Sequence, residues 1–156
     1  MRKRIISPDQ ETIAPIDLEW LNLEELAEAE ITSEDSAHPI ESALLPARSG
    51  WRAASSGKQT IRIIFNHPQR LRRIWLMFVE PHAERTQEFL LRWSPDGGLS
   101  FQDIMRQQWN FSPNGSSRET EDLHVELTSV TVLELSIIPD ISGADAFASL
   151  AQMYLA

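Results

Sequence analysis

Apolar and polar residues alternate most clearly in the segment QEFLLRWSPDGGLSF, residues 87–101. Phe89, Leu91 and Trp93 recur at every second position, which is the period of a strand that buries one face. We therefore expect these three side chains to be buried together in a core. Arg92 lies between them and is expected on the opposite face, toward solvent.

Turn-forming residues follow this strand. The segment SPDGG, residues 94–98, combines a proline that fixes φ, an aspartate that can bond its own backbone and two glycines that tolerate positive φ. A second strand is predicted from residue 101 to about 109, so the whole segment is a hairpin. Ile104 beside Met105 interrupts the alternation and predicts a β-bulge there.

Further short apolar or alternating runs predict the remaining strands. Residues 71–79 are apolar on both faces from residue 74 onward, which is typical of a central strand. Turn signals separate the runs, including those at 66–70 and 128–130, and no long helix is predicted. About eight short strands of this kind indicate an all-β antiparallel sandwich or jelly roll. The other predicted strands cover residues 27–32, 51–54, 61–65, 123–127, 131–138 and 149–155.

The chain divides into an N-terminal arm, residues 1–26, and a β-sandwich domain, residues 27–156. The arm carries two prolines and little periodicity, so it is predicted to be partly disordered or to dock on a partner. A short helical turn is expected near residue 22. Two interpretations of Trp20 stay open, because it either covers the core or docks onto another protein.

Composition and charge exclude several classes of function. The 156 residues include no cysteine, which excludes disulfides and thiolate chemistry, and carry a net charge of −9. Eleven of the 23 acidic residues lie in residues 1–45. Nucleic acid is not an expected partner, because the overall charge repels phosphates. Neither a membrane span nor a secretory signal is predicted, so we expect cytoplasmic residence.

Several segments, taken in their order along the chain, resemble the discoidin-type modules of the galactose-binding-like jelly-roll family, which include coagulation-factor C domains. The resemblance covers about residues 27–155, and its most specific part is FLLRWSPDGG followed by Phe101. It implies a galactose-binding-like β-sandwich that binds glycans, lipids or proteins through loops, usually without catalysis. The family often carries Asp-Gly before the Trp, near a structural calcium site. Here Arg48, Ser49 and Gly50 precede Trp51, so no metal is assigned.

The alternation of strand direction predicts which loops lie together. If each turn reverses the chain, turns 55–57, 81–85, 111–119 and 139–148 share one end of the sandwich with loop 33–39, opposite the termini. This end is also where the resembling family usually binds its ligands. An aromatic face with cationic, imidazole and carboxylate groups suits a sugar or another small polar ligand. The candidate ligand-binding residues are Glu34, His38, His82, Arg85, Trp109, Asn114, Arg118 and Glu119.

Trp109 and Arg118 are the strongest of these candidates, although Trp109 could equally pack in the core. No nucleophile motif, phosphate loop or histidine pair at metal-ligand spacing occurs, so we expect no catalysis, no cofactor and no metal. Two functions follow. The first is a non-catalytic module that binds a carbohydrate or small polar ligand. The alternative is an adaptor that binds another protein or itself through the acidic N-terminal region.

Overall fold

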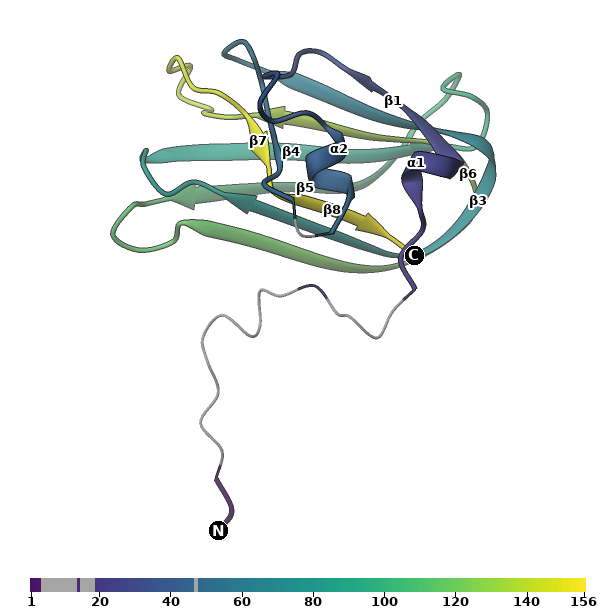
Figure 1. Ribbon diagram of the computed structural model, residues 1–156, viewed down its shortest axis with the longest axis horizontal. Coiled ribbons are helices and arrows are strands. Elements are labelled where there is room, and N and C mark those ends of the chain that lie inside the picture. The colour runs from purple at the N-terminus through teal and green to yellow at the C-terminus, as the bar shows by residue number, and fades with distance from the viewer. Residues whose placement is uncertain (4–13, 15–18, 47) are drawn as a thin grey trace.

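Two long strands, β3 (Gln59–Val79) and β6 (Arg118–Ile138), organise the computed structural model (Figure 1). The structure describes residues 1–3, 14, 19–46 and 48–156. β3 and β6 pair antiparallel, and each contributes to both layers of a β-sandwich. The other elements are α1 (Leu23–Leu26), β1 (Ala27–Ile31), α2 (Glu41–Leu44), β2 (Trp51–Arg52), β4 (Arg85–Ser94), β5 (Gln102–Phe111), β7 (Ser149–Leu150) and β8 (Gln152–Leu155).

One layer has the strand order β1-β3-β6-β4-β5, and β8 pairs with the second half of β3 in the other layer. This arrangement of antiparallel strands in two packed layers is that of a jelly roll. The predicted all-β fold class is therefore confirmed. β2 and β7 form a separate two-stranded sheet. Apolar side chains from both layers fill the interior, including those of β3, whose residues 74–76 are all buried.

The predicted breaks at 66–70 and 128–130 are wrong, because β3 and β6 continue through both positions. Register shifts between Ile64 and Arg73 absorb extra residues at the bend, as β-bulges do. Pro68 has no backbone N–H to donate and lies in the gap between the paired residues Ile64 and Gln69. Figure 1 shows β3 curving from one layer into the other at this point. The chain therefore reverses direction without leaving the sheet.

The registers place each connection at an end of the sandwich. β4 begins beside the end of β6, where Glu88 faces Ile138, and it ends where Ser94 faces Val132. The connection 95–101 therefore lies at the end where β3 and β6 bend, together with the C-terminus, whose Ala156 bonds Arg73. Connections 80–84, 112–117 and 139–148 lie at the opposite end, which we call the loop end. This agrees with the predicted placement of the loops.

The predicted hairpin is present as β4 and β5. Phe89 and Leu91 are fully buried, but Trp93 is only partly buried. A register shift follows Leu91, which pairs with Met105 while the next residue pairs with Asp103. This confirms the predicted bulge. The Arg92 side chain lies on the outer face as expected, but it is half-buried and bonded to Glu134.

Residues 19–26, assigned above to the arm, pack against the domain. Leu23 of α1 is buried in the core, and the N–H of Leu21 donates to the carbonyl of Leu155 at 2.7 Å. The ring of Trp20 lies 5.8 Å from that of Tyr154, which favours the core-covering interpretation. Most of residues 4–18 lie outside the described residues. Among the described residues, neither four-residue helix is long enough to cross a membrane.

Candidate functional site

A hollow of about 460 Å³ opens at the loop end, between loop 33–39, the segment after β2 and loop 139–148. Its volume lies within the range of small-ligand sites, about 300–1,000 Å³. Its lining combines two carboxylates, a hydroxyl, a guanidinium and an aromatic ring with two alanines. The lining residues are Glu34, Asp35, Ser36, Arg52, Ala53, Ala54 and Phe147.

Local hydrogen bonds hold loop 33–39 in place. Ser33 Oγ accepts the N–H of Ala54 at 3.0 Å and bonds Gln59 Oε1 at 2.8 Å. The indole N–H of Trp51 donates to the Ser33 carbonyl at 3.1 Å. Within the loop, Glu34 Oε2 accepts the N–H of Ile40 at 2.9 Å. The loop is therefore tied to β2, to β3 and to its own far end, so the hollow is pre-formed.

Three charged side chains, Glu34, Asp35 and Arg52, set the electrostatics of the hollow. The N–H of Ala37 and the imidazole of His38 both bond Asp35, and they lower the pKa of its carboxyl below the usual value. Asp35 is therefore ionised at neutral pH. The Arg52 guanidinium stands 6.0 Å from the centroid of the Phe147 ring, at the outer limit of a cation–π contact. Phe147 exposes 39% of its surface.

A second, smaller hollow of about 190 Å³ adjoins the first and shares Arg52 with it. His38, Trp51 and Ser149 contribute to its wall. Gly50 lies beside it in the left-handed region at φ 91°, and a Cβ there would approach the carbonyl oxygen of Leu150 to 2.8 Å. Glycine is thus required where the chain enters β2 and passes close to the β7–β8 segment.

The eight predicted site residues are distributed over this end of the molecule. Glu34 lines the larger hollow and His38 the smaller one. His82, Asn114 and Arg118 are exposed, on or beside the connections 80–84 and 112–117. None of these three lines either hollow. Their role in ligand binding stays a prediction.

The remaining three predicted residues face the interior. Arg85 is 4% exposed, donates to Glu80 and to the carbonyl of Pro139, and stacks on Phe111 at 4.7 Å. Trp109 is half-buried against the core, and its indole nitrogen is buried. The contacts of Arg85 are thus those of a structural ion pair. The sequence pattern placed Arg85 in a loop, whereas β4 already begins at this residue.

Glu119 is fully buried on β6, where its Oε1 accepts the amide of Gln87 at 3.1 Å. Among the described residues, its Oε2 has no hydrogen-bond partner. Burial, together with the neighbouring Glu121 carboxylate, raises the pKa of Glu119 to about 8. Glu119 is therefore protonated and uncharged at neutral pH.

We expect the folded state to lose stability as the pH rises from about 4.5 toward about 8. In that interval the folded state keeps the Glu119 proton that the unfolded state has released, so a higher pH favours unfolding. The variant Glu119→Gln, which is neutral at every pH, should flatten this part of the pH dependence. Urea unfolding across the interval tests this, with the exposed Glu84→Gln as matched control. Equal slopes for wild type and Glu119→Gln would contradict the assignment.

Sequence reasoning missed six of the seven residues that line the larger hollow, among them three with charged or aromatic side chains: Asp35, Arg52 and Phe147. Phe147 carried the clearest signal, because it is the one aromatic residue in loop 139–148. Asp35 sat beside a chosen residue, Glu34. Arg52 was assigned to a strand, and the sequence does not show that its side chain points into the hollow.

Several solved structures that share this fold are described as carbohydrate-binding modules. The chain is 18% identical to a CBM32 module from Clostridium perfringens in complex with GalNAc-β-1,3-galactose, with a TM-score of 0.61 over 88% of this chain and 99% of that one. A chitosan-binding module from Paenibacillus sp. IK-5 gives 15% identity and 0.59 over 87% and 98%. The same fold is found here. The predicted resemblance to discoidin-type jelly rolls is thereby confirmed at the level of fold.

The fold also occurs as part of larger enzymes. A Ruminococcus gnavus fucosidase in complex with fucose matches 86% of this chain but only 26% of its own, at 7% identity and a TM-score of 0.64. No protein-family model and no curated protein sequence matches the chain. For the structural calcium site of the resembling family, the described residues provide no group of three or more acidic or histidine side chains that could hold an ion.

Proposed function

We propose that the chain is a non-catalytic binding module that takes a carbohydrate in the larger hollow at the loop end. The single observation that supports this most is the combination of an exposed aromatic ring, Phe147, with Arg52 and Asp35 around a pre-formed hollow of about 460 Å³. The carbohydrate-binding modules with the same fold support the ligand class.

The side chains divide the recognition between them. A sugar ring would lay its C–H surface on Phe147, as apolar ligand faces do on aromatic rings. Arg52 would donate to ring or hydroxyl oxygens, while Asp35 and Ser36 would accept or exchange hydroxyl hydrogen bonds. The pre-formed loop lowers the entropy cost of binding.

The charge of the hollow predicts which sugars bind best. Glu34 and Asp35 outnumber the single cation, Arg52, so the lining carries a net negative charge. A uronate would be repelled, whereas a neutral or amino sugar would not. We therefore expect galactose-type or amino-sugar glycans to bind more tightly than polyuronates of the same length.

A glycan array followed by calorimetric titration of the full chain tests the proposal. The double variant Arg52→Ala plus Phe147→Ala should raise the dissociation constant about tenfold or more. A second double variant, Trp109→Ala plus Arg118→Ala, tests the loop group predicted from the sequence. Leu99→Ala, an exposed residue at the opposite end, is the matched control and should bind like wild type.

The outcomes separate the function from the site. Absence of saturable binding by the wild type to any glycan would overturn the function. Binding that is lost in the Trp109/Arg118 variant but kept in the Arg52/Phe147 variant would move the site to β5 and β6. Binding kept in both would exclude both locations.

The alternative function, an adaptor or self-associating subunit, rests on the acidic N-terminal third. Trp20, proposed from sequence as its docking residue, packs against Tyr154 of its own chain. A different surface of the same acidic region supports an interaction better, and it is considered next.

A further inference from the structure

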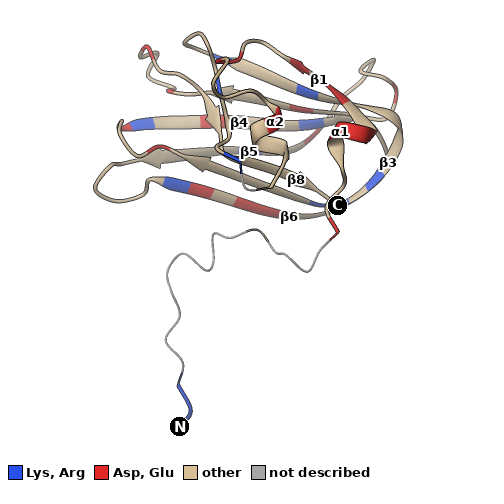
Figure 2. Cartoon of the chain, in the orientation of Figure 1, with Lys and Arg blue, Asp and Glu red and all other residues tan. Residues whose placement is uncertain are grey.

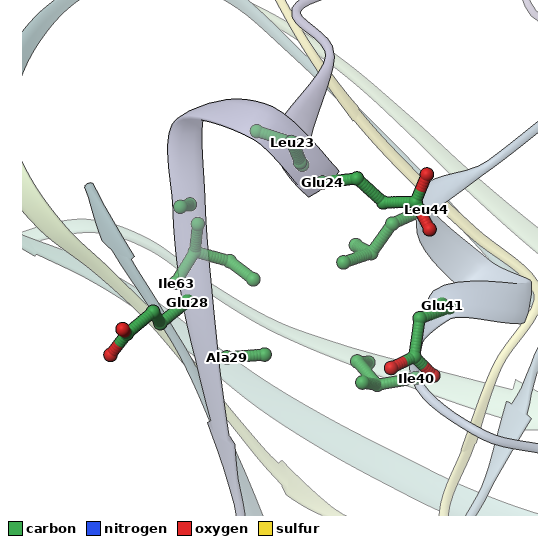
Figure 3. Close-up of a pocket in the computed structure, with 9 residues that line it drawn as sticks. Leu23, Glu24, Glu28, Ala29, Ile40, Glu41, Leu44 and Ile63 are labelled. Carbon is green, nitrogen blue, oxygen red and sulfur yellow. The ribbon is translucent and has the colours of Figure 1, made fainter. Parts of the chain in front are cut away.

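A pocket of about 430 Å³ lies at the edge of the sandwich, away from the loop-end hollow, between β1, α1 and α2 (Figure 3). Its floor and walls are mainly aliphatic, and acidic side chains stand around it. Figure 3 shows Ala29 of β1 facing Ile40 and Leu44 across the space. The residues that line it are Leu23, Glu24, Ala27, Glu28, Ala29, Ile40, Glu41, Leu44 and Ile63.

The pocket exists because β1 carries small side chains where it faces the core. Ala27 and Ala29 pair with Phe65 and Ile63 of β3, yet each offers only a methyl group. A larger aliphatic residue at either position would fill the gap between β1 and α2, since cores pack without voids when side chains are large enough. Ile40 and Ile63 are buried and form the apolar floor.

The rim is acidic and lacks a counter-charge from its own segment. Glu24, Glu28 and Glu41 are exposed, and residues 19–46 contain no lysine or arginine. Glu24 and Glu41 stand on the pocket side, whereas Figure 3 shows Glu28 on the opposite side of β1. An apolar floor beside two carboxylates suits a ligand that carries an apolar group next to cations. Neutral sugars do not have that combination, so this pocket is unlike the loop-end hollow.

The chain itself carries a segment of this chemistry. Its first three residues are Met1, Arg2 and Lys3, and the sequence continues with Arg4 and two isoleucines. Met1 to Lys3 are exposed, and Met1 is the most exposed large apolar side chain among the described residues. A methionine side chain adapts readily to an irregular apolar pocket.

We propose that the acidic pocket binds the Met1–Lys3 segment of a second copy of this chain. Met1 would enter the aliphatic pocket, and Arg2 and Lys3 would face Glu24 and Glu41. We commit to a second copy rather than to the same chain because every copy carries both the basic segment and the acidic pocket, whereas binding within one chain would leave the protein monomeric. Figure 2 shows the two opposite charges, on the basic N-terminus and on the acidic α1.

Sedimentation velocity on the full chain, at protein concentrations up to about 1 mM and at low salt, tests the proposal. Wild type should associate with concentration, and added salt should weaken this because the contacts are charged. Reversing the segment (Arg2→Glu plus Lys3→Glu) or the pocket (Glu24→Lys plus Glu41→Lys) should each weaken association about tenfold or more. Combining both reversals in one chain restores opposite charges and should restore association.

Two further variants separate this contact from general charge effects. Glu84→Lys plus Asp145→Lys makes the same change in net charge at exposed positions away from the pocket and should leave association unchanged. Ala29→Leu fills the pocket without altering charge and should weaken association.

A wild type that stays monomeric overturns the proposal, as does a combined reversal that fails to restore association. Equal loss in the Glu84/Asp145 control also overturns it. Glycan binding is measured independently, so either proposal can fail alone.

Discussion

Phe89→Ala is expected to lower the free energy of unfolding by about 3–5 kcal/mol, the usual cost of removing a large buried aromatic side chain. Phe89 is fully buried in the centre of β4, and its ring stacks on Phe78 at a centroid distance of 5.3 Å. The substitution removes that contact and leaves a cavity between the two layers. A domain of this size has about 5–15 kcal/mol in total, so the variant should fold but melt well below wild type.

Urea unfolding of wild type and variant measures this loss as a shift of midpoint at an unchanged slope. The matched control is Leu99→Ala, because Leu99 is 90% exposed in the β4–β5 connection and should cost less than about 0.5 kcal/mol. A loss for Phe89→Ala no larger than that of the control would show that the two layers do not pack as described.

The strands were predictable because one physical rule, burial of every second side chain, determines them. The segment 87–93 obeys it, and Phe89 and Leu91 are buried as expected. The continuation of β3 and β6 through the bend could not be predicted. Asn66, His67 and Pro68 have the composition of a turn that ends a strand, but here they form the bend of one continuous strand.

The candidate site was less predictable than the fold. Strand alternation predicts which loops share an end, and the registers agree with it, but it cannot tell which side chains turn inward. Arg85 and Glu119 stand at the beginnings of β4 and β6, and both point into the interior. Charged residues are rarely buried unless paired. Glu119 bonds Gln87 and Arg85 bonds the Pro139 carbonyl, 32 and 54 residues away in the sequence, so these partners are close only in the folded chain.

A row of alternating charges crosses the outer face of the five-stranded layer. It could not be predicted from the sequence, because each member lies on a different strand. The registers set Glu30 opposite Arg62, Arg62 opposite Glu134, Glu134 opposite Arg92 and Arg92 opposite Asp103. Glu134, at the centre, is 3% exposed. It accepts hydrogen bonds from Arg62 Nε at 2.8 Å and Arg92 Nε at 2.9 Å.

Burial alone would raise the pKa of Glu134, but the two guanidinium groups outweigh it and hold the pKa below its usual value. The carboxylate is therefore charged and depends on both arginines. Phe101 covers one of them, with the Arg92 guanidinium 4.2 Å from the ring centroid. Arg92, expected from the sequence to face solvent, is thus part of the central ion triad.

Removing both arginines, Arg62→Ala plus Arg92→Ala, should lower the free energy of unfolding at neutral pH by about 3–5 kcal/mol, because it leaves a buried carboxylate without a counter-charge. The loss should shrink as the pH falls through about 4.5, the usual value for glutamate, where Glu134 can take up a proton and become neutral. Urea unfolding at neutral and acidic pH measures both effects. Replacing all three members by leucine removes the charge with its partners, and this control should stay within about 1.5 kcal/mol of wild type or exceed it. If the triple leucine variant is destabilised as much as the double alanine variant, side-chain packing rather than the unpaired charge accounts for the loss.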